Sequence, residues 1–160
     1  MPKNILIVDD YLVVRTGISI ILEAHFKNVN LFTAENFPDT IDFIKDNKVE
    51  LIILDINIPG GKNKEMIKEI KELQPNAKIL IFSSYDEDTF AHEYVIAGAN
   101  GYLNKLSDEG MIILAVETIL KTGNYYTTDI MNAIINKKSA NPLDKLSKRE
   151  FEISELLIEG

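Results

Sequence analysis

Short, mainly apolar runs alternate along this chain with longer segments in which apolar residues recur at helical spacing. The runs span residues 4–8, 29–34, 51–54, 78–82 and 101–103. Apolar runs of this length, bounded by polar or turn-forming residues, are typical of strands that are buried on both faces of a parallel sheet. The pattern therefore predicts five strands connected by helices.

A helical segment follows each of the five runs. These segments span about residues 14–22, 39–45, 66–73, 86–97 and 108–120. Pro75 and Gly98 end two of them, and Ser107 is positioned to cap the last one. Five strand–helix units predict an α/β fold with a five-stranded, doubly wound parallel sheet. In the commonest strand order, 2-1-3-4-5, the first and third strands are neighbours.

Three acidic residues directly follow two of the predicted strands. Asp9 and Asp10 come after the first strand, and Asp55 comes after the third. Ligands of such sheets bind in the crevice outside the carboxyl ends of the strands, where these side chains would converge. Carboxylates so close together repel each other unless a cation joins them. A few carboxylates with room for water are typical of a magnesium site.

Two further polar residues lie at the ends of predicted strands. Ser83 follows the fourth apolar run, and Lys105 follows the fifth. A hydroxyl, an ammonium group and a magnesium ion around one carboxylate form a cradle for a phosphoryl group. The carboxylate of Asp55 could then act as a nucleophile and form an aspartyl phosphate.

Composition narrows the range of possible functions. The 160 residues include no cysteine, which excludes disulfides, thiol catalysis and thiolate metal sites. The net charge of −8 argues against nucleic-acid binding by this chain alone. With no membrane-length apolar stretch and no signal-peptide pattern, we expect a cytoplasmic protein without a membrane partner.

The pattern changes after residue 123. We assign residues 1–123 to the α/β domain, 124–143 to a helix (about 128–136) followed by a linker, and 144–160 to the start of another domain. Ser147 and Glu150 form a capping box that opens an apolar helical run. A lone helix of this length does not stay folded in isolation, so the sequence predicts an incomplete, truncated helical domain.

The strand-end residues carry a resemblance to a known family. The Asp9–Asp10 pair, Asp55 in LIILDINIPG, Ser83 in ILIFSSYDED, and Tyr102 with Lys105 in GYLNK resemble the receiver domain of bacterial response regulators. The resemblance covers about residues 4–123. The tail LSKREFEISELLIEG resembles the opening of a LuxR-type helix-turn-helix domain. Together they indicate the NarL/FixJ class and its flavodoxin-like receiver fold.

The resemblance implies a set of roles at the acidic site. Asp55 would accept a phosphoryl group from a histidine kinase. Magnesium would be bound by Asp10, Asp55 and the backbone carbonyl of Asn57, with Asp9 acting largely through water. The protein would be a phosphorylation switch and not an enzyme with its own substrate. The output would be DNA binding by the full-length C-terminal domain, not by this fragment.

The resemblance also implies a switch. Lys105 would contact a phosphoryl oxygen, Ser83 would move to hydrogen-bond the phosphoryl group, and Tyr102 would swing inward to follow it. Asn57 and Tyr85 occupy positions that tune dephosphorylation in the family. Asn63 stands where glycine is usual, a substitution that tolerates left-handed backbone geometry. Many relatives form homodimers through receiver surfaces.

Alternative functions follow from the same residues. A receiver could serve as a protein-binding or phosphorelay module with no DNA output. A haloacid-dehalogenase-like phosphatase also forms an aspartyl phosphate, but it needs a second aspartate where this chain has Asn57. Taken singly, each of these strand-end residues is more simply a turn, cap or surface residue. Their joint position at strand ends favours the receiver.

Overall fold

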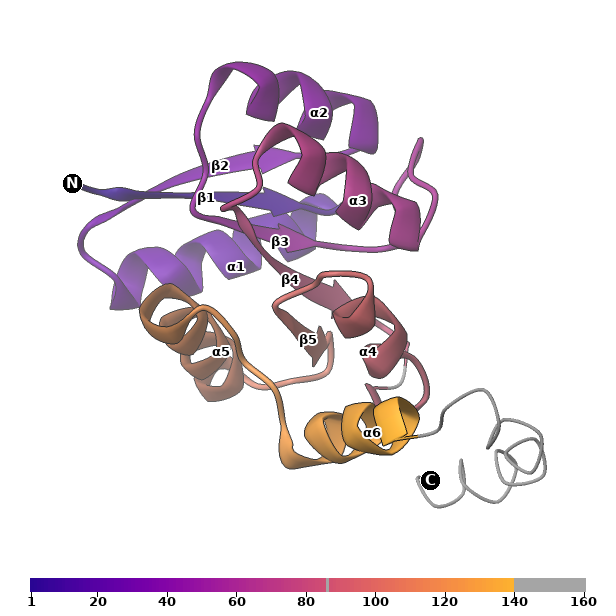
Figure 1. Ribbon diagram of the computed structural model, residues 1–160. Coiled ribbons are helices and arrows are strands. Elements are labelled where there is room, and N and C mark those ends of the chain that lie inside the picture. The colour runs from indigo at the N-terminus through magenta and orange to yellow at the C-terminus, as the bar shows by residue number, and fades with distance from the viewer. Residues whose placement is uncertain (86, 140–160) are drawn as a thin grey trace.

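Five parallel strands form the centre of the computed structural model, which describes residues 1–85 and 87–139 (Figure 1). The strands are β1 (Lys3–Val8), β2 (Val29–Ala34), β3 (Leu51–Leu54), β4 (Lys78–Ser83) and β5 (Gly101–Asn104). Their order in the sheet is β2-β1-β3-β4-β5, as predicted. Val8 pairs with Leu54, so β1 and β3 end at the same level of the sheet.

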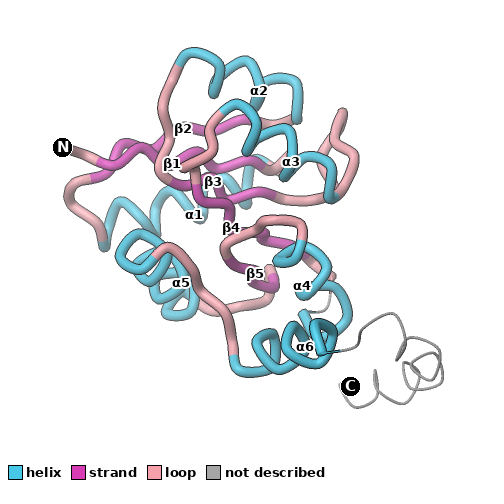
Figure 2. The backbone as a smooth tube through the Cα atoms, in the orientation of Figure 1, coloured by secondary structure: helices cyan, strands magenta, loops and turns pink. Residues whose placement is uncertain are grey.

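Helices cover both faces of the sheet (Figures 1 and 2). One face carries α1 (Leu12–His25) and α5 (Glu109–Thr122). The other carries α2 (Phe37–Asp46), α3 (Lys64–Leu73) and α4 (Glu87–Ile96). This arrangement confirms the doubly wound fold, because right-handed crossovers place successive helices on opposite faces wherever the winding direction reverses.

Alternate residues of each strand enter two separate cores. In β1, Leu6 and Val8 pack on the side of α2 and α3, whereas Ile5 and Ile7 pack on the side of α1 and α5. All four side chains are buried. Burial on both faces explains why β1, β3 and β4 are recognisable as uninterrupted apolar runs, whereas the edge strand β2 is partly exposed and polar residues interrupt its apolar sequence.

Local hydrogen bonds set helix ends that differ slightly from the predicted ones. Asp108, and not Ser107, is the N-cap of α5, since its side chain accepts a hydrogen bond from the backbone N–H of Met111. The prediction for Ser107 was therefore wrong by one residue; an aspartate caps as well as a serine. Asn63 precedes α3 with a positive φ of 52°, as expected from its replacement of glycine.

A sixth helix, α6 (Thr128–Ser139), packs against α4 (Figure 1). The connection from α5 forms a bridge between Gly101 and Tyr125 at the edge of the sheet, and Ile130 enters the core beside α4. The predicted linker was wrong at residues 137–139, which are helical; lysine is a good helix former, and the first breaker, Pro142, comes later. The rest of the linker and residues 144–160 lie outside the described residues.

Within the described residues, the helices are all too short or too polar to cross a lipid bilayer.

Candidate functional site

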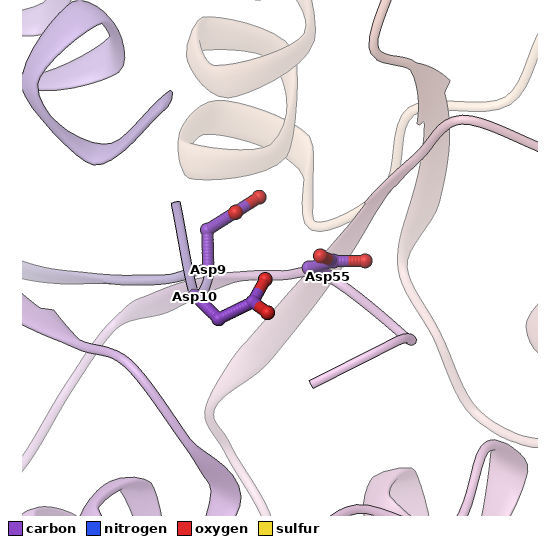
Figure 3. Close-up of side chains that lie close together, drawn as sticks. All are labelled: Asp9, Asp10 and Asp55. Carbon is purple, nitrogen blue, oxygen red and sulfur yellow. The ribbon is translucent and has the colours of Figure 1, made fainter. Parts of the chain in front are cut away.

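The three acidic residues lie together at the carboxyl ends of β1 and β3 (Figure 3). One carboxylate oxygen from each of Asp9, Asp10 and Asp55 lies within 4.8 Å of the others. Asp9 is 1% exposed and Asp55 is 4% exposed, whereas Asp10 is exposed to solvent. The three side chains converge because β1 and β3 end at the same level, which brings residues distant in the sequence together at the carboxyl ends of the strands.

Lys105 bridges two of these carboxylates from the end of β5. Its Nζ lies 2.6 Å from Asp9 Oδ2 and 3.1 Å from Asp55 Oδ2. Burial lowers the pKa of this lysine, but the two carboxylates outweigh that effect and hold its pKa above the ordinary value. The ammonium group is therefore charged at neutral pH and offsets part of the repulsion between the acids.

Asp55 has a raised pKa. Burial is the largest cause, and it outweighs the hydrogen bond from the Asn57 backbone N–H and the attraction of Lys105, both of which lower the pKa. The Asn57 N–H donates to Asp55 Oδ1 at 3.0 Å, so that oxygen is oriented while Oδ2 faces Lys105. A carboxylate desolvated in this way gains from any further positive charge in the pocket.

The pocket fits a divalent cation. The buried Asp9 Oδ2 has the Lys105 ammonium group as its charged partner at 2.6 Å. Three carboxylates lie together beside this one ammonium group, which leaves an excess of negative charge. A hard cation such as magnesium, bound through oxygen ligands, would offset that excess.

Ser83 is the last residue of β4, and Tyr102, the second residue of β5, lies at the same level of the sheet as the last residue of β3. Ser83 is fully buried, its Oγ accepts a hydrogen bond from the Tyr85 N–H at 3.0 Å, and its carbonyl accepts one from the Lys105 N–H at 2.8 Å. Tyr102 is also fully buried, and its ring centroid lies 6.2 Å from that of Tyr94 in α4. The tyrosine ring is thus already in an inward position.

A model of the response regulator receiver domain matches residues 5–117. The chain belongs to this family. The similarity to curated proteins extends beyond residue 117, because two of them match almost the whole chain.

The receiver has relatives of two kinds among curated proteins. It is 30% identical over 162 residues to the Fimbriae Z protein of Escherichia coli (strain K12), covering 99% of this chain and 77% of that protein. It is 32% identical over 168 residues to the oxygen regulatory protein NreC of Staphylococcus haemolyticus (strain JCSC1435), covering 98% of this chain and 77% of that protein. The matched region thus leaves about a quarter of each relative's length uncovered.

A solved structure agrees with the fold of the receiver. The LuxR-family two-component response regulator from Aurantimonas sp. SI85-9A1 superposes with a TM-score of 0.74 at 26% identity, covering 87% of this chain and 99% of that one. The chain is therefore a receiver of a two-component response regulator, with LuxR-family relatives.

The structure brings the residues predicted from the receiver motifs to one end of the sheet, but it also adds a residue that the sequence did not single out. Arg15, in the first turn of α1, donates from Nη1 to the main-chain oxygen of Asp9 at 2.7 Å. No spacing rule pointed to it, because a contact from a helix back to the loop before it depends on the loop's path. The one available signal in the sequence was that Arg15 is a basic residue a few positions after the acidic pair.

Proposed function

We propose that this receiver is a phosphorylation switch in which Asp55 accepts a phosphoryl group from a histidine kinase. An oxygen of the Asp55 carboxylate attacks phosphorus while the phosphorus–nitrogen bond of the phosphohistidine breaks, which leaves an aspartyl phosphate and a free histidine. The observation that carries the proposal is the Lys105 ammonium group between Asp9 and Asp55. It supplies positive charge beside a desolvated carboxylate, where a phosphoryl group develops negative charge.

Magnesium would be held by Asp10, Asp55 and the Asn57 carbonyl, with Asp9 acting largely through water. When bound, it would neutralise negative charge on the phosphoryl oxygens. Asp9 and Lys105 have complementary tasks in this scheme. Asp9 keeps Lys105 charged and directed into the pocket, and Lys105 can turn from Asp9 towards a phosphoryl oxygen once Asp55 has reacted.

The switch would run through the ends of β4 and β5. The Ser83 hydroxyl is bound to the Tyr85 N–H and would exchange this partner for a phosphoryl oxygen. Movement of Ser83 would shift Tyr85, whose carbonyl oxygen accepts a hydrogen bond from Tyr102. Such a switch requires contacts that differ between two states. Asn57 and Tyr85 flank the site and would tune how fast the phosphoryl group is lost.

The surface around the pocket suits a protein partner. Tyr11, Leu12 and Leu106 are large apolar residues with exposed side chains, and the Tyr11 ring lies 5.9 Å from Lys105 Nζ. Apolar residues next to a polar reaction site favour docking of another protein over binding of a free small molecule. We assign the kinase to this surface, and we place the whole exchange in the cytoplasm.

The output would be DNA binding and transcriptional control through a C-terminal domain. Residues 1–123 would form the receiver, 124–143 the connection, and 144–160 the beginning of a LuxR-type helix-turn-helix domain. The support is the LuxR-family relative, the regulatory name of NreC, and the part of both curated relatives that this chain does not cover. A receiver that acts as a protein-binding or phosphorelay module is the second candidate. Homodimerisation is compatible with either candidate.

Intact-mass measurement tests the phosphoacceptor. The chain is incubated with acetyl phosphate and magnesium, and Asp55→Asn is compared with Asp46→Asn, an exposed aspartate of α2. We expect one phosphoryl adduct on the wild type and on Asp46→Asn, none on Asp55→Asn, and none without magnesium. An undiminished adduct on Asp55→Asn would overturn the assignment. Binding of the full-length protein to DNA, with and without phosphorylation, separates the two outputs.

A further inference from the structure

Arg15 ties the acidic pocket to helix α1. Its side chain is 13% exposed, its Nη1 donates to the Asp9 carbonyl oxygen at 2.7 Å, and its Nη2 lies 3.9 Å from a carboxylate oxygen of Glu35. Glu35 directly follows β2, and Asp9 directly follows β1. One guanidinium group therefore reaches the carboxyl ends of two strands, from a helix that packs on one face of the sheet.

The Asp9 carbonyl belongs to the peptide group that joins Asp9 to Asp10. A peptide group is planar, so a hydrogen bond to its oxygen restrains the orientation of the plane that runs from the Cα of Asp9 to the Cα of Asp10. Two of the three clustered carboxylates extend from the ends of this single plane. The Asp9 N–H donates to the Ala34 carbonyl, and Asp9 Oδ1 accepts from the Tyr11 N–H. Arg15 supplies the remaining restraint, on the carbonyl itself.

We propose that Arg15 is a positioning residue that sets the separation of the Asp9 and Asp10 carboxylates for binding of a divalent cation. This inference rests on the magnesium site of the proposed function. The guanidinium is positively charged at physiological pH and points at the backbone and not at a ligand oxygen, so it favours the acidic cluster without competing for its ligands. Partners outside the ligand shell commonly change metal affinity by roughly ten- to a hundredfold.

The test compares magnesium binding by wild type, Arg15→Ala and Arg15→Lys with isothermal titration calorimetry. We expect roughly tenfold weaker binding for Arg15→Ala. For Arg15→Lys we expect partial recovery, because lysine keeps the charge but lacks the planar fork that reaches two partners. Glu35→Gln removes the other partner of Arg15 and should leave magnesium affinity within about twofold of wild type.

A second measurement does not depend on magnesium. In Arg15→Ala, hydrogen exchange of the Tyr11 amide, which donates to Asp9, should accelerate at least about tenfold, while that of the Leu6 amide in β1 stays unchanged. Ile18→Val, a buried change farther along α1, is the matched control for a general loss of stability. It should lower overall stability while leaving magnesium affinity, and the exchange of the Tyr11 amide relative to that of the Leu6 amide, unchanged.

The outcomes distinguish failure of the positioning role of Arg15 from failure of the proposed magnesium-dependent function. Unchanged magnesium affinity in Arg15→Ala, or an equal loss in Ile18→Val, would overturn the positioning role. A wild type that binds no magnesium would instead contradict the proposed function, and the exchange of the Tyr11 amide would still decide whether Arg15 fixes the acidic segment.

Discussion

The Tyr102 hydroxyl donates a hydrogen bond to the main-chain oxygen of Tyr85 at 3.2 Å. The same oxygen accepts a second hydrogen bond from Asn104 Nδ2, and the Tyr85 N–H donates to Ser83 Oγ. Side chains from β4 and β5 thus hold the main chain of Tyr85 on both sides of the residue. The position of the loop after β4 is coupled to the position of the Tyr102 ring.

Tyr102→Phe should loosen this loop. The change removes one hydrogen bond, a loss of about 0.5–1.5 kcal/mol in the free energy of unfolding. We expect this loss in urea denaturation, together with faster hydrogen exchange at the Tyr85 amide. Tyr11→Phe, at an exposed position, is the matched control and should change neither measurement. Identical exchange in both variants would mean that the hydroxyl does not restrain the loop.

Asp55→Asn should stabilise the metal-free protein near neutral pH. The pKa of Asp55 is raised above 3.8, chiefly by burial, so the folded state holds this proton more tightly than the unfolded state does. Stability therefore falls as the pH rises from about 3.8 through the raised pKa. Asparagine removes that loss, so the variant should exceed wild type at about pH 7, and the difference should vanish below about pH 4.

Urea unfolding at several pH values without magnesium measures this difference. Repeating the series with magnesium should narrow it, because only the wild type keeps all three carboxylates for the cation. A stability gain of equal size at every pH would contradict the explanation by desolvation.

Ile130→Ala should weaken the attachment of α6. This side chain is 2% exposed and belongs to the core beside α4. Its truncation leaves a cavity, at a cost of about 2–4 kcal/mol in the free energy of unfolding. Ile135→Ala, on the same helix but 56% exposed, should cost well under about 1 kcal/mol. Equal losses in the two variants would indicate that α6 is not docked in solution.

Asn100→Ala should destabilise the end of the sheet opposite the acidic pocket. Asn100 Oδ1 accepts from the Ile79 N–H and from Lys71 Nζ, and its Nδ2 donates to Asn124. Alanine leaves these groups without their partner, and we expect a loss of about 2–4 kcal/mol. Asn100→Asp keeps both acceptor bonds and should lose less. Thermal unfolding of the two variants checks this order, and the reverse order would contradict it.

The fold and the acidic site could be predicted because short-range patterns determine them. The apolar run at β3 is bounded by polar residues on both sides, and the predicted limits of that strand are the observed ones. Since all strands are parallel, the residues that follow them all lie at the same end of the sheet, where the carboxyl ends of the strands meet. Convergence of Asp9, Asp10 and Asp55 therefore followed from the topology.

Other features depended on contacts that a pattern does not contain. Arg15 reaches Asp9 because the loop after β1 turns back towards α1, and several loop paths fit the same residues. The docking of α6 depends on Ile130 matching a space beside α4, which no periodicity reveals. Ser107 and Asp108 are adjacent and have similar capping strength, so the sequence could not distinguish them. The hydrogen bond that Asp108 Oδ1 accepts from the Met111 N–H identifies Asp108 as the cap.

The bridge between Gly101 and Tyr125 has a consequence for anything attached to the receiver. Because the connection after α5 is fixed to the sheet edge and α6 packs on α4, a following segment is attached through α6 and not directly to the end of α5. A domain on such a tether samples a smaller volume, which raises its effective concentration near α4. A modest change in α4 would then suffice to alter how often the two meet.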